Sequence, residues 1–245
     1  MSYNWNWQVF LQPSATGEGT YLAWLAEGLQ WTIFLSLSAW VIALIAGSVI
    51  GVLRTVPNRW LSTLATAYVE VFRNIPLLVQ LFIWYFVLPE LLPVEWGNAF
   101  KQTNPLTQQF FSAMLCLGLF TSARVAEQVR SGINSLPAGQ TAAGLAMGFT
   151  LIQVYRYVRL PMAYRIIVPP LTSEFLNIFK NSAVATTIGL IELSRQAQQL
   201  VDYTAQPYEA FIAVTVLYVM INVTVMFLMR RLETRVRVPG YIGGK

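Results

Sequence analysis

Polar side chains recur at helical spacing in an otherwise apolar segment, residues 166–190, and could line a path for a charged solute. They are Ser173, Asn177, Lys180, Asn181 and Thr187. A lysine at the centre of a membrane helix costs about 2.5–3.5 kcal/mol to insert, so a charged partner or a passing anion is expected. Glu174 lies about 240° from Lys180 around an ideal helix and is a poor partner. Asn177 and Asn181 can hydrogen-bond carboxylates without adding charge. The alternative is hydrogen bonding between helices, worth about 0.6 kcal/mol per pair, which explains the amides better than the lysine.

A second pair of charges interrupts the apolar segment 60–89. Glu70 and Arg73 are three positions apart, so they can pair on one face of a helix. Pro76 lacks a backbone donor and can kink the same helix. Charged residues inside membrane segments usually mark substrate or ion pathways. We therefore expect Arg73, with Glu70, to contribute to the path, although Lys180 is the stronger candidate. Anchoring of the helix at the membrane surface is the alternative.

Several kinds of chemistry are excluded by residues that the chain lacks. It contains no histidine and one cysteine, Cys116, so a histidine metal site, histidine acid–base catalysis and an internal disulfide are ruled out. The terminal Gly243-Gly244-Lys245 lacks the spacing and the following hydroxyl residue of a phosphate-binding loop. We therefore expect no catalytic residue, metal or cofactor in this chain, and any ATP must be bound by a separate subunit.

Apolar helices must hold these polar groups, and the composition is apolar enough for such helices. The chain of 245 residues is 56% hydrophobic and 11% charged, whereas a soluble domain carries about 25% charged residues. A membrane span needs roughly 20 mostly apolar residues. Five segments qualify, with interruptions in the second and fourth, at about 28–53, 61–89, 105–130, 164–190 and 209–230. We predict an all-α integral membrane protein with a single transmembrane domain, residues 1–245.

The distribution of basic residues predicts the orientation of these five spans. With the N-terminus outside, the inner segments hold twelve Lys and Arg residues and the outer segments hold only Lys101 and Arg195. The basic balance therefore follows the membrane and does not indicate nucleic-acid binding. The N-terminus has no basic region or cleavage site and is not a signal peptide. Its aromatic residues Trp5, Trp7 and Phe10 suit a short interfacial segment.

A cytoplasmic loop, residues 135–161, follows from this orientation and contains a distinctive pattern. The small residues Ala142, Ala143 and Gly144 are followed after three residues by Gly148. Nine residues then lead to Val158, and Leu160-Pro161 come after one more. The spacing predicts a short helix, a glycine turn and a second helical piece standing clear of the membrane. A partner protein could grip such a knob and move it as a rigid body.

This loop resembles the coupling loop of permease subunits of ABC importers, with Ala142 in place of the usual glutamate. Four further stretches resemble permeases of the polar amino-acid family, and their details resemble importers of glutamate and aspartate in Gram-negative bacteria. The stretches are 53–59, 68–93, 120–140 and 179–184, together with the tail 238–245. In the third stretch Arg124, Glu127, Gln128 and Ser131 share one polar face, which is either solvated or packed against the loop or a partner permease.

The resemblance implies the fold of type I importer permeases, a bacterial inner-membrane location and an acidic amino acid as substrate. It also implies a second permease, two cytoplasmic ATPase subunits that bind ATP and a periplasmic amino-acid-binding protein. The ATPase contact would use Ala142, Ala143, Gly144, Gly148 and Pro161, with Arg156 and Arg159 supplying charge. Because Ala142 replaces the acidic residue, we expect a heterodimer whose other permease retains it. Whether glutamate or aspartate is preferred stays open.

Two other classes of protein remain as alternatives. An ion-coupled secondary transporter needs inverted repeats and a coupling-ion site, and five spans cannot divide into equal halves. A scaffold without transport activity does not explain charges inside the spans. Co-purification with an ATPase subunit distinguishes these alternatives from the importer.

Overall fold

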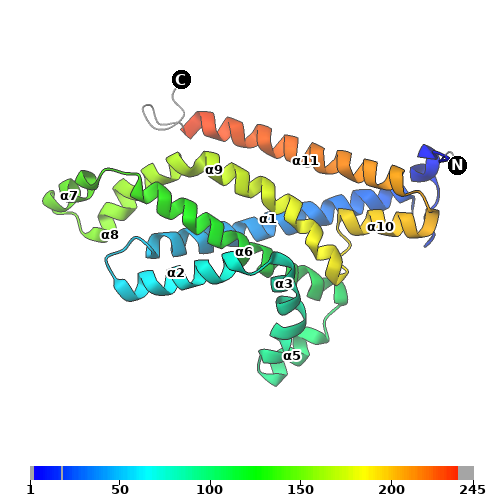
Figure 1. The fold of residues 1–245 in the computed structure, drawn as a ribbon, viewed down its shortest axis with the longest axis horizontal. Helices are drawn as coiled ribbons and strands as arrows, with labels where there is room; N and C mark the ends of the chain where they lie inside the picture. The colour runs from blue at the N-terminus through cyan, green and yellow to red at the C-terminus, as the bar shows by residue number, and fades with distance from the viewer. Residues whose placement is uncertain (1–2, 18, 237–245) are drawn as a thin grey trace. The chain divides into compact units, whose positions relative to one another are not determined.

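A computed structural model describes residues 3–17 and 19–236, and this part of the chain is helical (Figure 1). Apart from one isolated bridge between Pro13 and Thr20, it contains no β-strand. The α-helices are α1 (Tyr21–Leu53), α2 (Arg59–Asn74), α3 (Leu77–Phe82), α4 (Leu88–Leu91), α5 (Val94–Lys101), α6 (Pro105–Asn134), α7 (Ala138–Ala146), α8 (Leu151–Val154), α9 (Leu160–Asn181), α10 (Leu193–Thr204) and α11 (Pro207–Val236). Short 3-10 segments η1 (Trp7–Leu11) and η4 (Ser182–Ile188) and π-helical segments η2 (Ile83–Val87) and η3 (Tyr155–Arg159) complete it. The all-helical prediction is confirmed for these residues.

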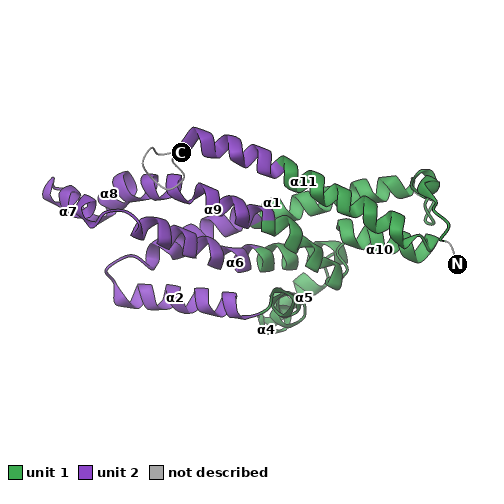
Figure 2. Cartoon of the chain, turned by 45° about the horizontal axis from the view of Figure 1, so that its top comes forward, with its two compact units in different colours: residues 1–39, 76–117, 177–224 green, residues 40–75, 118–176, 225–245 purple. Residues whose placement is uncertain are grey.

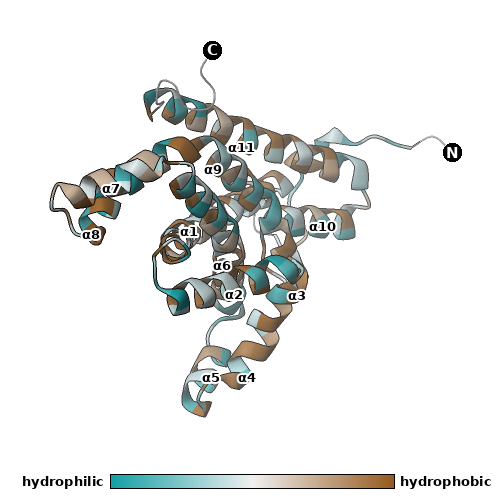
Figure 3. Cartoon of the chain, turned by 60° about the vertical axis from the view of Figure 1, so that its left-hand side comes forward, coloured by the Kyte–Doolittle hydropathy of each residue, from teal (hydrophilic) through white to brown (hydrophobic). Residues whose placement is uncertain are grey.

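Three of these helices, α1, α6 and α11, are long and apolar enough to cross a membrane. They contain 33, 30 and 30 residues, more than the roughly 20 that a span requires. The apolar colouring of Figure 3 is spread along α11. Among the described residues, α2 and the helical stretch after it satisfy the same criterion only as a broken pair, which raises the number of candidate spans to four. The predicted number of five spans is therefore not confirmed.

The predicted second span, 61–89, is interrupted at its proline rather than merely kinked. Helix α2 ends at Asn74, and Ile75 and Pro76 both have extended ψ angles, 129° and 138°. A proline disfavours helical geometry in the residue before it, which explains the extended Ile75. Helix α3 then begins at Leu77.

The predicted fourth span, 164–190, also ends early as an α-helix. Helix α9 stops at Asn181, and the 3-10 segment η4 continues to Ile188. Gly189 then adopts a left-handed conformation, with φ of 91°. Thr187 therefore lies on η4 and not on the α-helical stripe, which corrects the prediction for this residue.

The chain divides into two compact units (Figure 2). Unit 1 comprises residues 1–39, 76–117 and 177–224, and unit 2 comprises residues 40–75, 118–176 and 225–245. The core of unit 1 joins η1, α1, α10 and α11 through buried residues that include Val9, Leu25, Leu193, Leu200 and Val214. The core of unit 2 joins α1, α6 and α9 through buried residues that include Ala43, Val125, Val129, Ile133 and Ile167.

Glycines allow the helices of unit 2 to approach closely. A Cβ atom on Gly47 of α1 would lie 2.6 Å from Val125 Cβ of α6. A Cβ atom on Gly132 of α6 would lie 2.4 Å from Ile167 Cγ2 of α9. Both distances are shorter than van der Waals contact, so any larger side chain would push these helices apart. Small residues serve the same purpose at helix contacts in membranes.

Candidate functional site

The predicted loop of unit 2 is a helix, a glycine turn and a second helix, as its spacing indicates. Helix α7 ends at Ala146, and Gly148 has φ of 85°, a conformation that side chains with a Cβ atom rarely adopt. The Phe149 N–H donates to Gly144 O and the Gly148 N–H to Leu145 O, at 3.1 and 3.0 Å. This pair of bonds is a Schellman motif, which terminates α7.

Helix α8 starts with its own reciprocal cap directly after that turn. The Thr150 hydroxyl accepts the Gln153 N–H at 3.3 Å, and the Gln153 side-chain oxygen accepts the Thr150 N–H at 2.7 Å. The two bonds form a capping box, which satisfies backbone donors at a helix start. Gly144 is buried against Val154 of α8, where a Cβ atom would lie 2.9 Å from Val154 Cγ2. We call residues 138–154, which form this two-helix arrangement, the knob.

The surface of the knob is largely apolar. Ala142 and Ala143 are exposed, and Figure 3 shows apolar and hydrophilic residues together on α7 and α8. Four larger apolar side chains of the knob are also exposed: Leu145, Met147, Phe149 and Ile152. Exposed apolar groups that lie together in this way are suited to contact with another protein.

The chain directly after the knob is attached to the rest of unit 2 by Tyr155 and Arg159. The Tyr155 hydroxyl donates to Thr55 O at 2.8 Å, in the connection between α1 and α2. Arg159 donates to Ile133 O at 3.0 Å, and its guanidinium lies 5.3 Å from the centre of the Tyr155 ring. Arg159 is therefore occupied within unit 2, whereas Arg156 is exposed and its guanidinium lies 5.6 Å from the centre of the Tyr157 ring. Of the two predicted cations, Arg156 is the accessible one.

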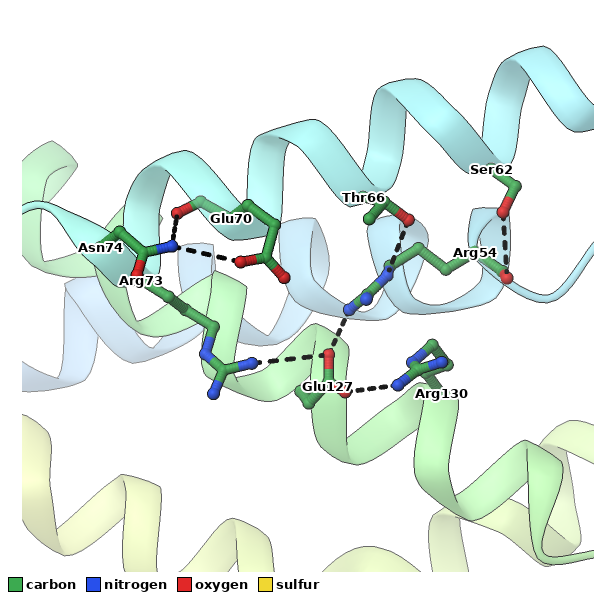
Figure 4. Close-up of polar contacts among 8 residues, drawn as sticks. All are labelled: Arg54, Ser62, Thr66, Glu70, Arg73, Asn74, Glu127 and Arg130. Atoms are coloured by element: carbon green, nitrogen blue, oxygen red, sulfur yellow. Dashed lines mark hydrogen bonds and ion pairs between the residues drawn. The ribbon is translucent and has the colours of Figure 1, made fainter.

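A second group of functional residues surrounds Glu127 of α6 (Figure 4). The Glu127 carboxylate contacts Arg54, accepts a hydrogen bond from Arg130 at 2.7 Å and lies 3.9 Å from Arg73 Nη1. Arg54 Nε also donates to Thr66 Oγ1 at 3.3 Å. We call Arg54, Arg73, Glu127 and Arg130 the Glu127 cluster. Three guanidinium groups share one carboxylate there, so the cluster carries net positive charge.

The predicted pairing of Glu70 with Arg73 is wrong. Figure 4 shows Arg73 directed at Glu127, while Asn74 contacts Glu70. The Asn74 amide donates to the Glu70 carboxylate at 3.1 Å and to the Glu70 carbonyl at 2.7 Å. The spacing of three residues permits a helical pair, but Glu127 offers Arg73 a carboxylate from a different helix.

A polar cavity of about 240 Å³ lies beside this cluster in unit 2. Its lining consists of Arg73, Arg124, Glu127, Gln128 and Glu174. Arg124 Nη1 lies 3.9 Å from the largely buried Glu174 carboxylate. Both Arg73 and Arg124 have about half of their side chains exposed, and within the described part of the chain their contacts with carboxylates are long, at 3.9 Å. Half-exposed guanidinium groups of this kind can bind a carboxylate that enters the cavity.

Most of the polar face predicted on α6 borders this cavity. Arg124, Glu127 and Gln128 line the cavity, and Ser131 is exposed. Sequence reasoning assigned no path role to Arg124, Glu127 or Glu174. No local spacing connects Arg124 with Glu174, because the two residues are 50 positions apart and meet only after α6 packs against α9.

Four residues of the predicted stripe lie on α9: Ser173, Asn177, Lys180 and Asn181. Thr187 lies beyond them, on η4. Lys180 is exposed at the end of α9, and within residues 3–17 and 19–236 no ion pair involves it. The Thr187 hydroxyl donates to Val184 O at 2.7 Å. Thr187 is thereby occupied within η4.

Comparison with known families places the chain. The family model of the inner membrane component of binding-protein-dependent transport systems matches residues 21–238. The chain belongs to this family. It is thus an inner-membrane transport component, in agreement with its apolar helices, and the knob and cavity both lie within the matched residues.

Individual relatives of this transport component agree with the family match. The glutamate/aspartate import permease protein GltJ of Escherichia coli is 58% identical over 246 residues, which cover 100% of both chains. A probable glutamine ABC transporter permease protein, GlnM of Bacillus subtilis, is 32% identical over 85% of this chain and 91% of its own. A solved structure of an amino acid ABC transporter with histidines has a TM-score of 0.72 and 30% identity, and covers 88% of this chain and 95% of that chain.

Proposed function

We propose that this chain is the membrane-spanning permease subunit of an ATP-driven importer for the acidic amino acids glutamate and aspartate. The observation that carries the proposal is the 58% identity to the glutamate/aspartate import permease GltJ over the full length of both chains. Relatives at 31–32% identity include glutamine permeases, so the acidic substrate rests on the higher identity to GltJ. The net positive Glu127 cluster beside the polar cavity supports an anionic substrate.

The importer requires partner subunits. Family membership implies a binding protein that delivers the amino acid, and relatives of the chain are ABC permeases, which use a separate ATPase. In the proposed assembly, this chain pairs with a second, different permease and two cytoplasmic ATPase subunits, and ATP is bound by the latter. The N-terminus is periplasmic, the C-terminus is cytoplasmic and five segments cross the membrane. The broken pair beginning with α2 would be the second of these segments. Helix α9, with 22 residues, would be the fourth.

The knob is the proposed contact with the ATPase. Its exposed Ala142 and Ala143, together with neighbouring apolar side chains, offer a surface that relies on shape. Gly144 and Gly148 set its geometry, Arg156 provides an accessible cation and Pro161 opens α9 behind it. Because Tyr155 attaches this region to the connection between α1 and α2 and Arg159 attaches it to α6, movement of the ATPase would be transmitted to the spans.

The polar cavity and the exposed Lys180 are the proposed contacts of the substrate path. In the cavity, Arg73 and Arg124 would bind a carboxylate, because each makes only a 3.9 Å contact with its acidic neighbour. Lys180, Asn177 and Asn181 would provide a second group of polar contacts for the substrate. Ser173, Thr187 and Glu70 are secondary candidates for the lining.

Reconstitution of the complete transporter tests this function. The permease, its co-purified partners and the binding protein are placed in proteoliposomes loaded with ATP, and uptake of labelled glutamate, aspartate and glutamine is compared. We expect ATP- and binding-protein-dependent uptake of the two acidic amino acids. Equal uptake without an ATPase subunit would refute the importer, and uptake of glutamine alone would refute the substrate class.

A further inference from the structure

Residues 3–12 are not used by the knob or the cavity, and they precede the residues that match the family. They are nevertheless firmly attached to unit 1. The Asn6 N–H donates to one oxygen of the fully buried Glu209 carboxylate at 2.6 Å, and the Tyr3 hydroxyl contacts the other. Two contacts to one buried carboxylate fix this segment at the start of α11.

The segment is also anchored by apolar packing and by the turn that follows it. Val9 of η1 is buried in the core of unit 1 with Leu193 and Leu200 of α10. The Tyr21 N–H donates to Gln12 O at 3.3 Å, and Pro13 and Thr20 form a bridge. The chain therefore passes over α10 and α11 and returns to the start of α1.

The outward side of this segment is aromatic. Trp5 and Trp7 are 52% and 50% exposed, and their rings stack with centroids 5.7 Å apart. The Tyr3 ring contacts the exposed Tyr208 ring edge to face at 4.5 Å. Leu11 is 71% exposed. The described residues 3–17 include no Asp, Glu, Lys or Arg, so the surface offers aromatic and apolar groups without charge.

We infer that residues 3–12, together with Tyr208, form a strap that lies in the boundary between lipid headgroups and acyl chains. Trp and Tyr are enriched at this depth of a membrane, because an apolar ring and a polar edge are both satisfied there. The strap adjoins the first residues of α1 and α11, the two long apolar helices that start in unit 1. Its exposed side is thus continuous with surface that lipid covers. The strap sets the depth at which α1 and α11 start.

A fluorescent probe on Leu11 tests this placement. Cys116 is the only cysteine, so Cys116→Ala with Leu11→Cys gives one labelling position, and Leu11→Cys leaves the aromatic residues intact. The labelled chain is reconstituted with its partner subunits, and quenching is compared for lipids carrying a spin label near the headgroup, lipids labelled deep in the acyl chain, and aqueous iodide. The matched control is Thr16→Cys, an exposed position on the polar turn.

Strong quenching of the Leu11 probe by the shallow lipid label, with weak quenching by iodide, is the expected result. The Thr16 probe should show the opposite pattern. Adding Trp5→Ser and Trp7→Ser should move the Leu11 probe toward iodide accessibility, because the aromatic anchors are lost. Quenching by iodide alone in the unaltered strap would overturn the inference. Protection from all three quenchers would also overturn it, since it would indicate a protein partner on this surface.

Discussion

Replacing Glu127 with glutamine should destabilise unit 2 through Arg54. The Arg54 side chain is only 6% exposed, so its guanidinium has little access to water once the carboxylate is removed. Its remaining contact, with Thr66 Oγ1 at 3.3 Å, is to an uncharged group. Removing one partner of a buried ion pair costs about 3–5 kcal/mol. Glu127 itself is 29% exposed, so the low end of this range, about 3 kcal/mol, applies.

Thermal unfolding of the purified complex measures this effect. A cost of about 3 kcal/mol corresponds to roughly 6–12 °C in midpoint for a domain of this size. Arg73→Gln is the matched control, because it removes a 3.9 Å contact made by a half-exposed side chain. Contacts of that kind contribute at most about 1 kcal/mol. The control should therefore shift the midpoint by no more than about 4 °C.

A double variant separates an unpaired charge from simple loss of packing. Arg54→Gln combined with Glu127→Gln leaves no buried guanidinium at position 54, so it should be more stable than Glu127→Gln alone. A midpoint for Glu127→Gln within 2 °C of the unaltered protein would refute the reasoning, as would additive losses in the double variant.

Three further predictions concern transport and assembly. Gly148→Ala should reduce uptake while the chain still inserts into the membrane, since φ of 85° costs an L-residue about 1–2 kcal/mol. Gly139→Ala is the control, because Gly139 also lies in open space but has no positive φ. Equal uptake by both variants would count against this prediction. Lys180→Gln should reduce glutamate uptake with binding-protein-stimulated ATP hydrolysis retained; unchanged uptake kinetics would make Lys180 structural. Mass spectrometry of the purified complex should find a second permease sequence, and its absence would contradict the heterodimer.

Features set by neighbouring residues could be predicted from the sequence. The glycine turn of the knob followed from the position of Gly148 after a small-residue helix, and its φ of 85° confirms that turn. The interruption of the second span was located at Pro76, although its extent was underestimated. Both features depend on backbone conformation within a few residues, and glycine and proline determine that conformation strongly.

Features set by distant residues could not be predicted in this way. Arg54 and Glu127 are 73 positions apart, and no pattern in either segment identifies the other as its partner. The sequence therefore predicts a pair of Arg73 with Glu70, which lies on the same helix. The polar cavity depends on the same kind of information, because its lining comes from α2, α6 and α9. Side-chain chemistry indicated that these residues needed partners, but tertiary packing determined which partners they have.

The two caps of the knob have a consequence for the kinetics and thermodynamics of assembly. Since α7 and α8 satisfy their adjoining ends by the Schellman bonds and the capping box, their conformation does not wait for a partner. Ala and Gly also lose no side-chain rotamer entropy on burial, whereas a long side chain loses up to about 2 kcal/mol. The Ala and Gly positions of the knob surface are therefore preorganised for contact with a partner. The proposed contact with the ATPase would then form and break without the knob folding again each time.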